Sequence, residues 1–145
     1  VGYSYRAVVS YIDSHGTREV LYTSPSETID NLDDPVQGEV TIIGEPKEGV
    51  TLRALSNSLS DEDGIASISI SWETSKDGRN WIGVNSLSGP VLSLGQSLVG
   101  SQVRARVAVV DNFGIETNLY SQATRTVENV NNKPSGRIVI RRVGQ

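Results

Sequence analysis

Carboxylate side chains gather in three short clusters, and these are the residues of the chain best suited to chemistry. The clusters are Asp30-Asn31-Leu32-Asp33-Asp34-Pro35, Asp61-Glu62-Asp63-Gly64 and Asp111-Asn112-Phe113-Gly114. Oxygen ligands without His or Cys suit a hard cation that takes about six to eight oxygens, which is Ca²⁺ rather than zinc or iron. The candidate metal ligands are Asp30, Asp33, Asp34, Asp61, Asp63 and Asp111.

Metal-free turns are the alternative interpretation of the same clusters. Asp and Asn side chains hydrogen-bond to the local backbone, and Gly adopts positive φ freely, so all three residue types are common in turns. Both interpretations stay open at the level of sequence. Calcium is favoured if the fold brings the three clusters to one place, because several carboxylates together repel one another unless a cation lies between them.

Other catalytic groups are scarce. The 145 residues include one His and no Cys, which excludes disulfides and thiolate metal or redox sites. His15 aligns with Phe113 in the internal repeat described below, so we expect a packing or surface role rather than acid–base catalysis. No phosphate-binding loop, catalytic carboxylate pair or Ser/His/Asp arrangement is visible, and the sequence therefore predicts no enzymatic activity.

Charge and hydropathy argue against two kinds of partner, nucleic acid and the membrane interior. The net charge is −4, with 17 acidic and 13 basic residues, which argues against nucleic acid as a partner. No apolar run approaches the roughly 18 residues of a membrane helix, so we expect no membrane insertion. Val1 heads no signal peptide, and we expect the chain to be an internal piece of a longer protein.

An internal repeat indicates how the chain that carries the acidic clusters is divided. A shift of 98 residues aligns 1–42 with 99–140 without a gap, and 13 positions are identical where about two or three are expected from composition. The sequence therefore predicts parts of three tandem repeats. These are the C-terminal hairpin of a preceding repeat plus a linker (1–34), a complete repeat (35–132) and the first strand of a following repeat (133–145).

Alternating apolar and polar residues predict strands. The apolar positions are Ala66, Ile68, Ile70 and Trp72 in one segment and Val103, Ala105, Val107 and Val109 in another. Further strands are expected over 39–43, 51–56, 81–84, 91–94 and 117–127. About seven short strands in roughly 100 residues indicate an all-β, Greek-key β-sandwich with Trp72 as its core anchor. Such a fold brings the loops before the third strand and after the sixth to the end where the linker enters, so the acidic clusters should converge.

The residues also carry a family resemblance. Ala108-Val109-Val110-Asp111-Asn112-Phe113-Gly114, followed by Glu128-Asn129-Val130-Asn131-Asn132-Lys133-Pro134, resembles the end of a cadherin-type repeat, where an Ala-x-x-Asp-x-x-Gly-like turn precedes an acidic linker. Asp61-x-Asp63 stands where such repeats carry an Asp-x-Asp calcium pair. The whole repeat also resembles the tandem immunoglobulin-like and cadherin-like repeats of very large secreted bacterial proteins, including adhesins and RTX-type exoproteins.

This resemblance implies a structural or adhesive module of a secreted or cell-surface, hence extracellular, protein. The module would be an extended spacer stiffened by calcium, with neighbouring repeats of the same chain and a cell-surface protein or glycan as its partners. Two departures matter. Leu98-Val99-Gly100-Ser101 stands where cadherins carry an acidic Asp-Arg-Glu-type motif, and the second linker has Asn131 and Asn132 where the first has Asp33 and Asp34. Fewer calcium ions than in cadherin junctions, or none at the second junction, would follow.

A carbohydrate- or protein-binding β-sandwich domain is the alternative function. Its surface would be the exposed face around Trp81 and the loop from Asn85 to Pro90, because an aromatic ring can stack on a sugar. Packing of Trp81 against the core or a sheet edge is the simpler expectation.

Overall fold

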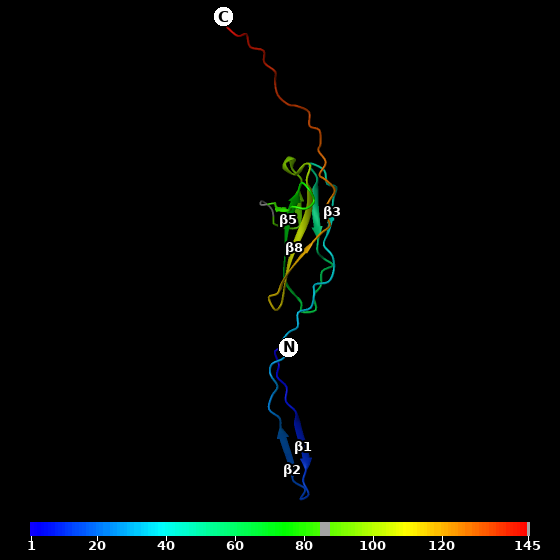
Figure 1. The fold of residues 1–145 in the computed structure, drawn as a ribbon, viewed down its shortest axis with the longest axis vertical. Coiled ribbons are helices and arrows are strands. Elements are labelled where there is room, and N and C mark those ends of the chain that lie inside the picture. The colour runs from blue at the N-terminus through cyan, green and yellow to red at the C-terminus, as the bar shows by residue number, and fades with distance from the viewer. Residues whose placement is uncertain (85–87, 145) are drawn as a thin grey trace. The chain divides into compact units, whose positions relative to one another are not determined.

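Antiparallel β-strands make up the regular structure of this protein (Figure 1). The computed structural model describes residues 1–84 and 88–144, and the chain divides into two units, Val1–Asp34 and Pro35–Gln145. The described residues form no α-helix, and their single short 3-10 helix, η1 (Gln96–Leu98), is not one that could cross a membrane. The prediction of an all-β chain is therefore confirmed.

The first unit is a β-hairpin. β1 (Val8–Ile12) pairs with β2 (Arg18–Tyr22), and every residue of both strands is exposed. The turn between them is closed by Asp13, whose Oδ1 accepts the backbone N–H groups of His15 at 2.9 Å and Thr17 at 2.8 Å. The backbone of the turn is also bonded, with the N–H of Gly16 on the Asp13 carbonyl at 3.0 Å, so the aspartate reinforces the turn and fixes where the hairpin reverses.

The second unit holds two antiparallel sheets. The first has the order β3-β4-β7 and the second the order β6-β5-β8-β9. Their strands are β3 (Thr41–Ile43), β4 (Thr51–Leu55), β5 (Ile65–Ser75), β6 (Ile82–Gly83), β7 (Val91–Ser93), β8 (Gln102–Asp111) and β9 (Glu116–Tyr120). The longest pairing joins β5 to β8, from Ile65 opposite Asp111 to Ser75 opposite Gln102.

The core of this unit is built on one face of β8. Burial alternates strictly along that strand, as the sequence predicts, because successive side chains of a strand point to opposite faces. Both sheets contribute to the same buried cluster, which includes Leu52 and Ala54 of β4, Leu92 of β7 and Trp72 of β5. Burial of apolar surface is worth about 25 cal/mol per Å², so this shared cluster is the main source of stability.

The first half of β5 differs from the prediction. Ala66 and Ile68 are exposed, Ile70 is half-buried, and the buried residues of the strand are Trp72 and Ser75. The cause is the short neighbouring strand β6, which pairs only with Glu73 and Thr74. The first half of β5 is therefore a sheet edge, where an inward-pointing side chain keeps part of its surface in water.

The strand expected over 117–127 stops at the end of β9. Beyond it the Ser121 hydroxyl accepts the N–H of Ala105 at 2.9 Å, and the Thr124 hydroxyl accepts the N–H of Val103 at 3.0 Å. Side-chain hydroxyls thus replace two carbonyl acceptors of the ladder. From Ser121 to Thr124 the segment advances by three residues, whereas β8 advances by only two, from Ala105 to Val103. The pairing is therefore irregular, and the strand ends although the segment still lies beside β8.

Two short bridges hold the two ends of the second unit. Near its start, Gln37 and Ser60 exchange backbone hydrogen bonds of 2.8 and 3.0 Å. Near its end, Glu128 donates its N–H to the Pro46 carbonyl and accepts the N–H of Glu48, both at 2.9 Å. The bridges tie the incoming and outgoing chain to the body of the unit.

Residues 133–144 are exposed and, within the described chain, carry no strand. Their predicted role as the first strand of a following repeat, and the repeat boundaries at 34 and 132, stay predictions.

Trp72→Ala should destabilise the second unit far more than Trp81→Ala. Trp72 is 1% exposed, its Nε1 donates to the Gly89 carbonyl at 3.0 Å, and removal of a buried Trp costs about 3–5 kcal/mol. Trp81 is only half-buried. Urea denaturation of the two variants measures the difference, and equal or reversed midpoints would contradict the assignment of the core.

A polypeptide of residues 35–132 should unfold cooperatively, whereas residues 1–34 alone should be unfolded. The second unit holds the buried cluster, and an isolated two-stranded hairpin is marginal in water. Circular dichroism during heating distinguishes the two outcomes. A disordered 35–132 polypeptide would show that the repeat boundaries are wrong.

Candidate metal centre

Asp111 ends β8 and is the most buried acid of the candidate site, with 3% of its surface exposed. Its Oδ1 accepts the N–H of Phe113 at 2.8 Å and that of Ile115 at 2.7 Å. Its own N–H donates to the Ile115 carbonyl at 3.0 Å. The Asp111 backbone and one carboxylate oxygen therefore close the turn into β9, which explains why an Asp is needed there without any metal.

The second oxygen of the same carboxylate is different. Among the described residues, Asp111 Oδ2 is the one buried side-chain polar atom that has no hydrogen-bond partner. An unsatisfied buried polar group costs roughly 1–3 kcal/mol, and more when it is charged. Turn chemistry does not account for this oxygen, so it points to a ligand.

The loop ahead of β5 presents Asp63. Asp61 Oδ1 accepts the N–H of Asp63 at 2.8 Å, and the Asp61 carbonyl accepts the N–H of Gly64 at 3.0 Å. The Gly64 carbonyl in turn accepts the N–H of Asn112 at 3.2 Å, which joins this loop to the turn after β8. Gly64 has φ 82°, a backbone conformation that favours glycine, and a Cβ there would press the end of the Asn112 side chain aside.

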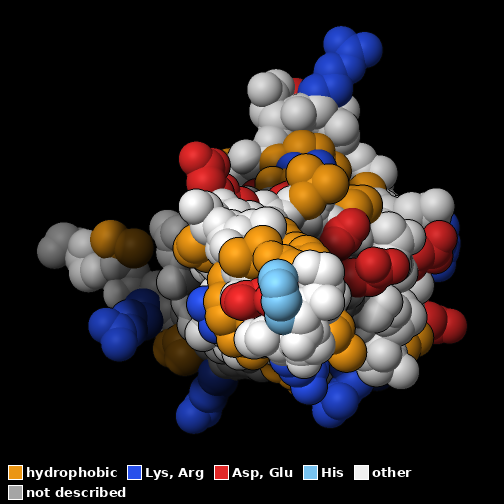
Figure 2. All heavy atoms as spheres, turned by 90° about the horizontal axis from the view of Figure 1, so that it is seen from below, with side chains coloured by type: hydrophobic (Ala, Val, Ile, Leu, Met, Phe, Trp, Pro, Cys, Tyr) orange, Lys and Arg blue, Asp and Glu red, His pale blue; other side chains and the backbone are white. Residues whose placement is uncertain are grey.

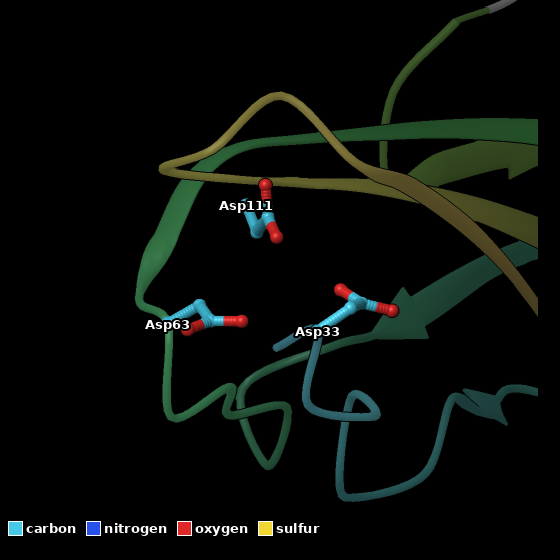
Figure 3. Close-up of side chains that lie close together, drawn as sticks. All are labelled: Asp33, Asp63 and Asp111. Carbon is cyan, nitrogen blue, oxygen red and sulfur yellow. The ribbon is translucent and has the colours of Figure 1, made fainter. Parts of the chain in front are cut away.

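Two aspartates of the predicted set lie close together in the second unit. Asp63 and Asp111 each have a carboxylate oxygen within 4.8 Å of one of the other, as Figure 3 shows. Asp33, near the end of the first unit, stays a predicted ligand.

The donor set fits Ca²⁺. Calcium binds oxygen at about 2.3–2.6 Å, so ligand oxygens on opposite sides of one ion lie up to about 5 Å apart. Two like charges about 4 Å apart repel by about 4 kcal/mol at an effective dielectric constant of about 20, and a divalent cation removes that cost. The cluster is therefore able to hold a metal ion, and the identity of the ion stays a prediction.

Asp61, the third predicted ligand of the second unit, uses Oδ1 to position Asp63. In the first unit Asp34 is half-buried, and Asp30 and Asp33 are exposed. Sequence reasoning missed the role of Gly64 and Asn112, whose contact sets the distance between the two loops. The only available signal was the glycine that directly follows the Asp-x-Asp pair.

The second linker is built differently. Glu128 is exposed and pairs with Arg125 at 3.1 Å, while Glu48 Oε2 accepts the N–H of Val130 at 3.0 Å. Among the described residues at this linker, no group of three acids is close enough to share a metal.

Trp81, the aromatic residue of the alternative binding surface, is half-buried and contacts an arginine. The Arg104 guanidinium lies 4.3 Å from the centroid of the Trp81 ring and 4.3 Å from that of Tyr120, and it pairs with Glu73 at 2.7 Å. Part of the loop in the alternative binding surface, Asn85 to Leu87, lies outside the described residues. His15 is exposed in the hairpin turn.

Comparison of the chain with protein-family models, with curated proteins and with solved structures gives no match.

Asp111→Asn and Asp111→Ala should differ in the absence of metal. Asn keeps the oxygen that accepts the two turn N–H groups and removes the charge, so the melting temperature in EDTA should be unchanged or higher. Ala leaves those N–H groups without an acceptor, at a cost of about 1–3 kcal/mol. Thermal melts of both variants in EDTA test this, and equal destabilisation by Asn and Ala would contradict it.

Proposed function

We propose that this chain is a structural repeat module of a large secreted or cell-surface protein, and that it is one link of an extended spacer whose repeats are stiffened by Ca²⁺. The observation that carries the proposal is the buried Asp111 Oδ2, which has no hydrogen-bond partner in the described chain and belongs to a carboxylate with an oxygen within 4.8 Å of one of Asp63.

The fold proposed for each complete repeat is a Greek-key β-sandwich of the immunoglobulin- and cadherin-like kind. Its support is that two antiparallel sheets share one buried cluster and that the chain passes between them from β4 to β5, from β6 to β7 and from β7 to β8. Long connections between sheets of this sort are typical of sandwiches.

The proposed role of calcium is to join the linker to the sandwich end. Asp63 and Asp111 hold the ion on the second unit, and Asp33 binds it from the segment that leads into Pro35. The two positive charges of the ion offset most of the repulsion among the three carboxylates, so the linker loses freedom and the junction becomes stiff. Stability in such an array is a sum of repeat terms and interface terms, and the ion strengthens an interface term.

The two junctions are proposed to be unequal. The first linker has Asp33 and Asp34 where the second has Asn131 and Asn132, and Glu128 already pairs with Arg125. Calcium affinity follows the number of charged ligands and the rigidity of the site. A spacer of this kind alternates stiff and compliant joints.

Ca²⁺ should raise the melting temperature of the full chain, because it binds only the folded state. Such binding adds about 2.7 kcal/mol when the free ion is at a hundred times its Kd. Asp63→Asn and Asp111→Asn should each abolish the rise. Asp33→Asn should weaken it and, in calorimetric titration, should lower the affinity.

Two matched carboxyl-to-amide changes serve as controls. Glu128→Gln lies at the second linker, and Asp77→Asn lies in the turn after β5. Hydrogen bonds from the N–H groups of Asn80 and Arg79 hold the pKa of Asp77 well below its ordinary value. Both controls should keep the full calcium response. No heat and no thermal shift at millimolar Ca²⁺ would leave the acidic clusters as plain turns and overturn the calcium part of the proposal.

A further inference from the structure

The hairpin of the first unit repeats the geometry of β8 and β9 residue for residue. Its five pairs run from Val8 opposite Tyr22 to Ile12 opposite Arg18, and they become the five pairs of β8 and β9 when 98 is added to each number. The sequence repeat alone predicts similar strands. The identical register is a separate observation, because a slip of one residue would turn every side chain to the opposite face.

The hydrogen bonds beyond the strands agree as well. The Thr23 hydroxyl accepts the N–H of Ala7 at 2.9 Å, which matches the 2.9 Å bond from Ala105 to Ser121. The N–H of Ser26 donates to the Tyr5 carbonyl at 2.7 Å, and the corresponding bond of the second unit is 2.8 Å. The hairpin therefore ends in the same irregular segment as its counterpart.

Burial is where the two copies differ. The inward side chains of the β8 copy are almost fully buried, whereas their counterparts in the hairpin are exposed. The exposed fractions are 62% for Tyr5, 53% for Val9, 48% for Tyr11 and 46% for Ile29, against 0% for Val103, Val107 and Val109 and 2% for Val127. Figure 2 shows hydrophobic side chains at the surface around the single histidine, which lies in the hairpin turn.

The second unit shows what covers this face in the other copy. β5 pairs with the edge of β8 that faces away from β9, with Trp72 opposite Ala105 and Glu73 opposite Arg104. The small alanine leaves room for the indole, and Arg104 forms an ion pair with Glu73 at 2.7 Å. The cover therefore consists of a strand with a large aromatic residue next to an acid.

The hairpin keeps its half of both contacts. Ala7 stands at the position of Ala105, and Arg6 stands at the position of Arg104. The Arg6 guanidinium lies 4.4 Å from the centroid of the Tyr22 ring, as Arg104 lies 4.3 Å from that of Tyr120. A strand that docks here meets a gap that fits an indole and a cation that fits a carboxylate.

We infer that the exposed face and free edge of the β1–β2 hairpin are a docking surface for the body of a preceding repeat of the same type as Pro35–Leu98. Its β5-like strand pairs antiparallel with β1, places a large aromatic side chain over Ala7 and gives a carboxylate to Arg6. This inference rests on the tandem-repeat part of the proposed function and is independent of calcium.

A second copy of this chain is a poorer occupant. Its own body already holds β8 against β5 along the whole strand, so the place that the hairpin would take is filled. Docking of a second copy would require β8 and β9 to leave first. The occupant that fits without such exchange is a repeat body that lacks these two strands.

The test is a longer chain in which a copy of residues 35–98 precedes Val1. The added segment then joins the hairpin as Leu98 joins Val99 in the second unit, so the register of the repeat is kept. Hydrogen exchange is followed in EDTA at the amides of Arg6, Val8 and Ser10. These amides face the free edge, because alternate residues of β1 bond to β2. We expect exchange to slow by about a hundredfold or more relative to the 145-residue chain.

Four further proteins complete the test. A chain with the added residues in shuffled order should show no protection. Ala7→Leu should leave the 145-residue chain unchanged, because Ala7 is exposed there, and should remove the protection in the longer chain by filling the gap for the indole. Tyr5→Val together with Tyr11→Val gives the longer chain the side chains of β8, in case tyrosines are too large for this particular body.

Protection with either the native tyrosines or the valines supports the inference. Fast exchange in both versions overturns it. Protection in the 145-residue chain itself that rises with protein concentration would overturn it in favour of a second copy. Because the measurement is made in EDTA, a negative result here is distinct from a failure of the calcium titration.

Discussion

The pairing of β5 with β8 is the contact on which the rest of the second unit depends. It brings Trp72 against Ala105 and thereby sets the centre of the buried cluster that both sheets share. The same ladder runs on to Ile65 opposite Asp111, at the end of the strands. The contact that forms the core therefore also decides where the most buried acid of the candidate site stands and which loop lies beside it.

Asp111 shows how one side chain serves the fold and the site together. Oδ1 closes the turn into β9, and Oδ2 is left buried without a hydrogen bond in the described chain. Asp13 occupies the same position in the hairpin and closes its turn in the same way, but it is only half-buried. The turn explains why an aspartate recurs at this position, whereas only burial beside Asp63 makes the second copy a candidate ligand.

Sequence patterns predicted the parts of this structure that depend on local alternation. Val103 to Val109 alternate in composition and in burial, because both neighbours of β8 run along it. Ile68 has the same pattern and is exposed, since the length of β6 is not encoded in β5 itself. The sequence did not predict where β9 ends. There the hydroxyls of Ser121 and Thr124 accept hydrogen bonds in place of backbone carbonyls, and the alternation of apolar residues does not show this.

The candidate site was predictable to the level of clusters and not to the level of ligands. The Asp-rich loops were expected to converge, and within the second unit Asp63 and Asp111 are the members that the structure brings together. Asp61 and Asp63 are both aspartates of one loop, so the sequence does not distinguish the ligand from its neighbour. In the structure Asp61 Oδ1 accepts the N–H of Asp63 at 2.8 Å, so Asp61 supports the loop and Asp63 is the candidate ligand.

The bridges at Gln37 and Glu128 have a mechanical consequence. Tension along the chain enters the second unit beside Gln37 and leaves it beside Glu128, so it loads the hydrogen bonds of these two bridges before it reaches the sheets. Each residue released there lengthens the chain by up to about 3.3–3.6 Å while the buried cluster stays closed. We therefore expect the hydrogen bonds of the two bridges to break before the sheets separate, and to form again when the force is removed.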